Sequence, residues 1–291
     1  MNQPLPAIAD VLAPGRVAPA RIAPRPAVEP RTFHLLHGAR GVAALAVVIF
    51  HYNHFYLADH TARDALPAVE AYPYAAILAP IYQHGDFAVE LFWVISGFVF
   101  AHAYLNRPTS PWRFAVARVA RLYPLHLLTL LMVAGLQAAS LAVAGHWQIY
   151  GNNDLHHFVL QLFFASNSVN VSHGLSFNGP IWSVSLEILV YAAFFLALWP
   201  LRRGGLWAAG AIAALCWGLY LAPVTPPVIS KMVLLCAGYF FLGTLVYGAY
   251  GGWMRLPWVL ALSLTGLVAG AWFEIGGLVE PAAATGLVAL L

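Results

Sequence analysis

The chain has 291 residues, of which 61% are hydrophobic and only 9% are charged, with a formal net charge of +3. Soluble domains carry about 25% charged residues. This composition therefore excludes a water-facing globular domain and indicates a polytopic membrane protein with no nucleic-acid partner. Cys216 and Cys236 lie in apolar stretches without CxxC spacing, so neither a disulfide framework nor a metal site is predicted.

Residues 1–30 are rich in proline, alanine and arginine. No apolar segment of the kind found in a cleaved signal peptide follows the start. We expect a disordered tail, and its arginines favour a cytoplasmic location by the positive-inside rule. Residues 31–291 are predicted to form one transmembrane domain.

We predict an all-α bundle of about eight apolar spans, because a spanning helix needs roughly 20 apolar residues. The first span is followed by a loop at 57–83, and the short apolar stretch at 158–170 is interpreted as interfacial or re-entrant. The spans are predicted at about 35–56, 84–105, 122–143, 179–200, 206–222, 228–248, 256–273 and from 282 onward.

The charge distribution gives the orientation of this bundle. With the N-terminus in the cytoplasm, every lysine and arginine except Arg63 and Lys231 falls on the cytoplasmic side, as the positive-inside rule requires. The last apolar stretch stops at Leu291 with no polar loop after it. We therefore expect the transmembrane domain to be C-terminally incomplete.

The first span carries Arg40 and, eleven positions later, His51. At about 100° per residue this spacing puts both side chains on one helix face, about 16 Å apart. An ionisable group at membrane depth costs about 2.5–3.5 kcal/mol and is usually functional. The face offers a fixed cation and a group that takes a proton near neutral pH. Alternatively, Arg40 is only a cytoplasmic anchor and His51 only an interfacial residue.

The second span contains Glu90 one helical turn after Asp86. Glu90 lies within an apolar run, so it must be paired, hydrogen-bonded or protonated. Ser96 and Gly97 form a small patch where a ligand or another helix can approach closely. Helix packing alone is the alternative explanation of this patch.

Arg118 and Arg121 lie three positions apart, on one face of a helix that emerges on the cytoplasmic side. Paired guanidinium groups suit phosphate oxygens, which they bind in a planar, bidentate way. The alternative is that these arginines only determine topology and contact lipid headgroups.

Ser183, Glu187 and Tyr191 follow one another at four-residue spacing and form a polar stripe on an apolar helix. A buried glutamate flanked by hydroxyls either tunes a proton-transfer site or satisfies a bundle interior. Trp182 is either a membrane-belt aromatic residue or a stacking platform for a sugar.

Taken in order, these motifs resemble the acyltransferase-3 family of integral membrane acyltransferases. The family pattern is Arg-x10-His in the first span, G-x-x-x-V-[DE]-x-F-F-x-x-SGF in the second, RxxR before R-x-Y-P, and a later W-S-x-x-x-E-x-x-x-Y. The resemblance covers about residues 35–250, and Glu90 stands where many members have aspartate. The matching residues are Arg40, His51, Gly85, Val89, Phe92, Ser96, Gly97, Phe98, Arg118, Arg121, Tyr123, Pro124, Trp182, Ser183, Glu187 and Tyr191.

The resemblance implies transfer of an acyl group, often acetyl, from cytoplasmic acyl-CoA to a hydroxyl of a carbohydrate or lipid-linked glycan at the inner membrane. His51 would act as general base, Arg40 would stabilise developing charge, and Glu90 or Glu187 would orient the histidine. Acyl-CoA is expected as a donor substrate, with membrane lipid as a further partner and no bound cofactor or metal. The expected substrate-binding residues are Arg118, Arg121, Ser96, Trp182, Ser183 and Tyr191.

Two other classes of function remain open from the residues alone. Buried Arg, Glu and His can line a transporter or proton-relay pathway, although 35–143 and 179–273 show no obvious similarity to each other. A non-catalytic membrane sensor is the second class. Acyl-CoA binding that depends on Arg118 and Arg121 would separate the enzyme from both.

Overall fold

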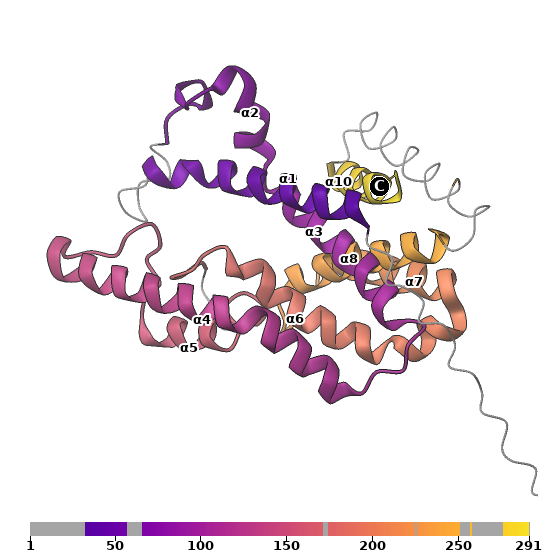
Figure 1. The fold of residues 1–291 in the computed structure, drawn as a ribbon. Helices are drawn as coiled ribbons and strands as arrows, with labels where there is room; N and C mark the ends of the chain where they lie inside the picture. Colours follow the sequence, from indigo (N-terminus) through magenta and orange to yellow (C-terminus); the bar gives the residue numbers. More distant parts are fainter. Residues whose placement is uncertain are drawn as a thin grey trace, which may run out of the picture. The chain divides into compact units, whose positions relative to one another are not determined.

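The computed structural model describes residues 33–56, 66–170, 174–224, 226–250, 257 and 276–290, and their regular elements are all helical (Figure 1). The helices belong to one compact unit, His34–Leu291. The predicted all-α fold is therefore confirmed for the part of the chain that is described. The expected tail at 1–30 and, apart from residue 257, the predicted span at 256–273 lie outside the described residues.

Five helical regions among the described residues are long and apolar enough to cross a membrane, so the predicted count of about eight is not confirmed. The predicted spans at 179–200 and 206–222 are separated by a kink at Gly205, where the backbone is non-helical with φ at +53°. The five regions are α1 (His34–Phe50) with η2 (His51–Tyr56), α3 (Phe87–Tyr104), α4 (Pro111–Ala144), α6 (Ile181–Leu196) with α7 (Leu198–Leu221), and α8 (Lys231–Tyr250).

Two segments differ from the sequence prediction, and a third, at 158–170, agrees with its interpretation as interfacial or re-entrant. The predicted loop at 57–83 contains η4 (Val69–Ala71) and α2 (Ala75–His84), which lies next to α1 (Figure 1). The third span begins at Pro111 rather than near 122, because the Ser110 hydroxyl caps α4 by accepting from the Arg113 N–H at 3.2 Å. Residues 158–170 contribute only the end of α5 (Leu155–Leu162), which is too short to span.

The interior of the bundle is centred on α3 and α8, which pack closely along glycines. A Cβ atom at Gly97 would lie 1.8 Å from the Phe240 carbonyl oxygen, and one at Gly243 would lie 1.9 Å from the Val94 carbonyl oxygen. Small residues allow this close approach of two backbones in a membrane bundle. Gly97 therefore serves helix packing, the alternative explanation given for it above.

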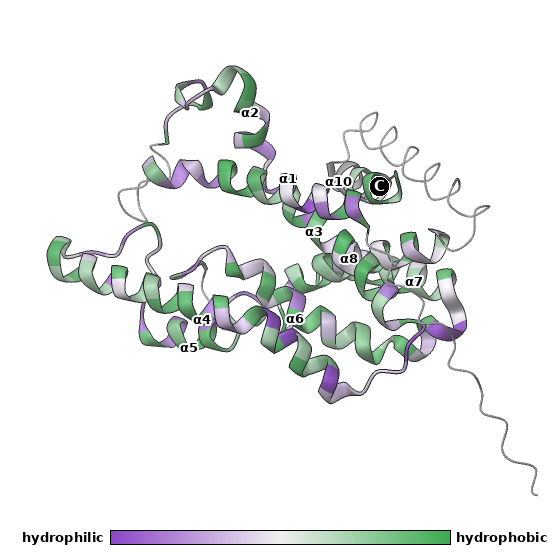
Figure 2. Cartoon of the chain, viewed as in Figure 1, coloured by the Kyte–Doolittle hydropathy of each residue, from purple (hydrophilic) through white to green (hydrophobic). Residues whose placement is uncertain are grey.

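The outward faces of the helices are apolar as well, and hydrophobic colours dominate all the long helices in Figure 2. Val42 and Val48 of α1 are exposed, as are Leu125, Leu128 and Leu136 of α4. An apolar face without a protein partner is expected where a helix contacts lipid chains. Together with their length, these faces identify the helices as those of a membrane protein. The last described helix, α10 (Gly276–Leu290), packs against α3 and α8.

Candidate active site

A cavity of about 360 Å³ lies between α1, α3, α4 and α6, and every predicted site residue except Glu90 lines it. These residues come from four motifs spread over 152 positions of sequence, Arg40 to Tyr191. The fold therefore brings them together, while their individual roles stay predictions. The site residues in the wall are Arg40, His51, Ser96, Arg118, Arg121, Trp182, Ser183, Glu187 and Tyr191.

Helical spacing explains how each element reaches the cavity. Helix α6 presents Ser183, Glu187 and Tyr191 at four-residue intervals, and α4 presents Arg118 and Arg121 at a three-residue interval. The first span contributes a stripe with spacings of four, three and four residues. That stripe consists of Arg40, Ala44, Val47 and His51.

His51 is held by a main-chain group of its own helix. Its Nδ1 lies 2.7 Å from the Val47 carbonyl oxygen. Because a carbonyl oxygen only accepts, Nδ1 carries the proton in this arrangement and the Nε2 lone pair remains available. The partner of Nδ1 is thus the Val47 carbonyl, and the orienting role expected for Glu90 or Glu187 stays a prediction. The helix tightens to 3-10 geometry at His51, four residues after the carbonyl that Nδ1 contacts.

Glu187 is fixed by Tyr191, one helical turn further along α6. The Tyr191 hydroxyl donates a short hydrogen bond to the Glu187 Oε2 atom. The Tyr191 ring is stacked on Phe100 of α3 with the ring centroids 4.3 Å apart. Glu187 also lies within electrostatic range of the Arg40 and Arg121 guanidinium groups. Two arginines of the site thus act electrostatically on this carboxyl group.

Arg118 is anchored on aromatic side chains of α3. Its guanidinium carbon lies 4.9 Å from the centroid of the Phe100 ring, and its Nη2 donates to the Tyr104 hydroxyl at 3.2 Å. Its buried Nε has no hydrogen-bond partner in the protein. Arg121, one turn later, is exposed. A buried N–H without a partner is costly. An anionic ligand that accepts from the Arg118 Nε would remove this cost, and Arg121 would supply further donors.

Glu90 does not share this cavity. It lines a separate apolar pocket of about 680 Å³ together with α1 and α10 residues such as Leu35, Ala39 and Leu287. Its neighbour Val89 lines the site cavity. One residue turns an α-helix by about 100°, which accounts for the different surroundings of the two side chains.

Sequence reasoning did not single out the residues of an adjoining cavity of about 400 Å³. Pro180 lines both cavities, and the adjoining one also contains His54, Gln137, Tyr150 and Asn178. The Tyr150 hydroxyl lies 3.5 Å from the His54 Nε2, and the His54 ring centroid lies 5.0 Å from that of His51. The three-residue spacing of His51 and His54 was the signal that could have revealed this extension.

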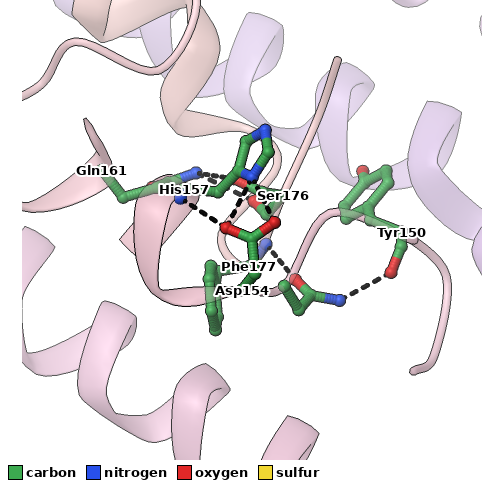
Figure 3. A network of polar contacts seen from close by, with 7 residues as sticks. Tyr150, Asp154, His157, Gln161, Ser176 and Phe177 are labelled. Atoms are coloured by element: carbon green, nitrogen blue, oxygen red, sulfur yellow. Dashed lines mark hydrogen bonds and ion pairs between the residues drawn. The ribbon is translucent and has the colours of Figure 1, made fainter. Parts of the chain in front are cut away.

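A polar network ties α5 to the segment that leads into α6 (Figure 3). The Asp154 carboxylate accepts from the His157 N–H at 2.9 Å and from the His157 ring at 2.9 Å. The backbone hydrogen bond, followed by the ring hydrogen bond, lowers the pKa of Asp154. Gln161 Nε2 donates to the Ser176 carbonyl at 2.8 Å, and the Phe177 N–H donates to Asn153 Oδ1 at 2.6 Å.

This network holds the backbone just before Pro180 and Trp182, which line the site cavity. The Asn178 amide adds a bond to the Thr129 hydroxyl of α4 at 2.8 Å. Among the described residues, no group of three or more His, Cys, Asp or Glu side chains is arranged to hold a metal ion. The partner of the His157 ring in this network is the Asp154 carboxylate.

A cavity lined by a histidine, a carboxylate and three arginines, inside a bundle of apolar helices, defines the candidate active site of an integral membrane protein. The sequence profile of the acyltransferase-3 family, described as an acyltransferase domain, matches residues 33–289. The chain belongs to this family and is an acyltransferase, as its motifs indicated.

Two curated relatives have related sequences. "Protein 2 in picA locus" of Rhizobium radiobacter is 31% identical over 189 residues, which cover 60% of this chain and 85% of that protein. "Acyltransferase MdmB" of Streptomyces mycarofaciens is 32% identical over 198 residues, which cover 64% of this chain and 46% of that protein. The match thus spans less than half the length of the second relative. No solved structure matches the chain.

Proposed function

We propose that the protein transfers an acyl group, acetyl in the simplest case, from cytoplasmic acyl-CoA to a hydroxyl of a carbohydrate or lipid-linked glycan at the inner membrane. The observation that carries the proposal is the meeting of Arg40 and His51 with Arg118 and Arg121 in one cavity. It unites a base and a charge stabiliser with a pair of phosphate-binding groups.

His51 Nε2 accepts the proton of the acceptor hydroxyl while the hydroxyl oxygen attacks the thioester carbonyl carbon. The tetrahedral intermediate carries an oxyanion, which the Arg40 guanidinium stabilises. Its collapse breaks the carbon–sulfur bond, and the imidazolium returns the proton to the departing CoA thiolate. The Val47 carbonyl supports this cycle because it keeps the proton of His51 on Nδ1 in the resting state.

Arg118 and Arg121 bind the phosphates of CoA in this proposal. The buried, unpartnered Nε of Arg118 supports the assignment, since a phosphate oxygen is a strong acceptor for it. Glu187 orients the Arg40 guanidinium, because its carboxylate is held by Tyr191 and acts on that charge. Glu90 lies on another pocket and takes no part in the chemistry.

The acceptor enters through the adjoining cavity at Pro180. Trp182, Ser183 and Tyr150 supply the aromatic faces and the hydroxyls that sugars commonly contact. The position of His54 and Tyr150 beside His51 supports this route, because an acceptor there lies next to the base.

The purified protein in detergent tests the proposal directly. We expect binding of acetyl-CoA, transfer of labelled acetyl to a glycan extract of the membrane, and loss of transfer in His51→Ala with donor binding retained. Full transfer by His51→Ala would overturn the base assignment. An absence of acyl-CoA binding to the wild-type protein would instead favour the transporter or the sensor.

A further inference from the structure

A second, apolar pocket of about 560 Å³ lies between α4, the end of α5 and α6. It shares three wall residues with the site cavity: Arg118, Leu122 and Tyr191. Arg118 is the one charged side chain in its wall. The remaining wall is aliphatic and aromatic. Phe114 and Val119 come from α4, Phe195 comes from α6, and Phe164 follows the end of α5.

We propose that this apolar pocket takes the alkyl chain of the donor, so that the enzyme accepts acyl groups longer than acetyl. The inference rests on the proposed function, because the thioester carbonyl has to lie in the site cavity beside His51. From there the alkyl chain passes Leu122 and Tyr191 in the shared wall and is buried against the apolar surface of the pocket, which removes it from water. The polar head and the apolar tail of one acyl-CoA then match two adjoining cavities of opposite character.

The shared wall argues for the donor rather than for an unrelated lipid, because a chain in this pocket continues directly from the site cavity. Arg118 belongs to both cavities and has an unpartnered Nε. A ligand that has both an anionic group and a chain satisfies both properties of this wall. The size is sufficient as well, because an apolar cavity of about 150 Å³ takes up benzene, and the pocket of about 560 Å³ has room for an eight-carbon chain.

The test compares acetyl-, butanoyl- and octanoyl-CoA as donors for the purified protein. Each buried methylene contributes about 0.8 kcal/mol, so KM should fall up to about fourfold per added methylene until the pocket is filled. Ala115→Phe and Ala192→Phe place a ring in the pocket from α4 and α6. Each should lower the octanoyl-to-acetyl ratio of kcat/KM at least tenfold.

Ala117→Phe and Ala193→Phe are the matched controls. Both alanines are exposed on the same two helices and lie outside the pocket wall, so the octanoyl-to-acetyl ratio should keep its wild-type value. Monodisperse elution in detergent confirms that each variant is folded. An unchanged ratio in Ala115→Phe and Ala192→Phe would overturn the proposal, and membrane lipid that co-purifies less with these two variants would then identify a lipid chain as the occupant.

Binding of thioether analogues of the same three donors, which cannot react, separates this proposal from the proposed function. Tighter binding of the octanoyl analogue that is lost in Ala115→Phe supports the pocket even if no acyl transfer occurs. Acetyl transfer with equal binding of all three analogues supports the transfer reaction and overturns the pocket.

Discussion

The site cavity and the α5 network both contain histidine beside polar neighbours, yet they use it differently. In the network, His157 meets the Asp154 carboxylate, and the surrounding bonds tie one backbone segment to another. In the cavity, His51 uses one ring nitrogen for its own main chain and lines an open volume with the other groups of the site. The hydrogen bonds of the network hold backbone segments together, whereas the site cavity leaves room for a ligand beside His51.

The largest expected effect tests this difference at the two histidines. His51→Ala should lower acyl transfer by about 10²–10⁴-fold, the range for loss of a general base, in a radiolabel transfer assay. His157→Ala should lower the thermal stability while the folded protein keeps its kcat. Equal loss of kcat in both variants would remove the distinction between the two regions.

The arginines sharpen the comparison along a single helix. Arg118→Ala should raise the KM for acyl-CoA by about 10–100-fold, because a hydrogen bond to a charged group contributes about 1.5–3 kcal/mol. Arg113→Ala is the control, since Arg113 is exposed on the same helix and does not line the cavity. A similar rise in KM for both variants would mean that the arginines attract the anionic donor only through the overall positive charge of the helix.

Glu187 lines the site cavity and Glu90 does not. Variants of the two glutamates therefore test whether a place in the wall of this cavity is needed for a role in catalysis. Glu187→Gln should lower kcat by about tenfold, because the charge held between Tyr191 and the arginines is lost. Glu90→Gln should change kcat by less than about threefold, since Glu90 lies on the separate pocket. A greater loss in Glu90→Gln would restore the catalytic role that the sequence suggested for it.

The smallest effect concerns Asp154 in the α5 network. Asp154→Ala removes the cap of α5 and should cost about 1 kcal/mol of stability, whereas Asp154→Asn keeps a cap acceptor and should lose less. The hydrogen bonds lower the pKa of Asp154 in the folded protein. Its stabilising contribution is therefore present above the ordinary aspartate pKa of about 3.9 and is lost as the pH falls through the lower folded value.

Thermal unfolding of both variants in detergent, from neutral pH to about pH 3, measures this effect. The difference between wild type and Asp154→Ala should be constant near neutral pH and should shrink in the acid range. A difference that grows as the pH falls would contradict the assignment, and so would a change in the KM for either substrate.

Sequence reasoning predicted those parts of the site that depend on position along one helix. The eleven-residue spacing placed Arg40 and His51 on one stripe, and the four-residue spacing did the same for Ser183, Glu187 and Tyr191. Sequence spacing did not predict that Glu90 lines a separate pocket, because that placement depends on which helices pack on each side of α3. The partner of His51 depends on a local change of helix type, which hydropathy does not encode.

The fold likewise has features that the sequence predicted and features that it did not. Apolar length identified the spanning helices, but the start of α4 follows from the cap at Ser110, and the short helix α2 interrupts a stretch expected to be loop. The kink at Gly205 separates the two predicted spans at 179–200 and 206–222. These features follow from backbone geometry at single residues, to which a count of apolar residues is insensitive.

The glycine seam between α3 and α8 has a consequence for how the enzyme admits its substrates. With Gly97 and Gly243 each against a facing carbonyl, the two helices have no clearance to slide or separate without losing the contact that holds them. Ser96, next to Gly97, is therefore held in the wall of the site cavity by the packing of α3 against α8. A movement that opens the site cavity is then expected at α1 and α4, whose exposed faces are apolar, and the lipid composition around these two helices should influence the turnover rate.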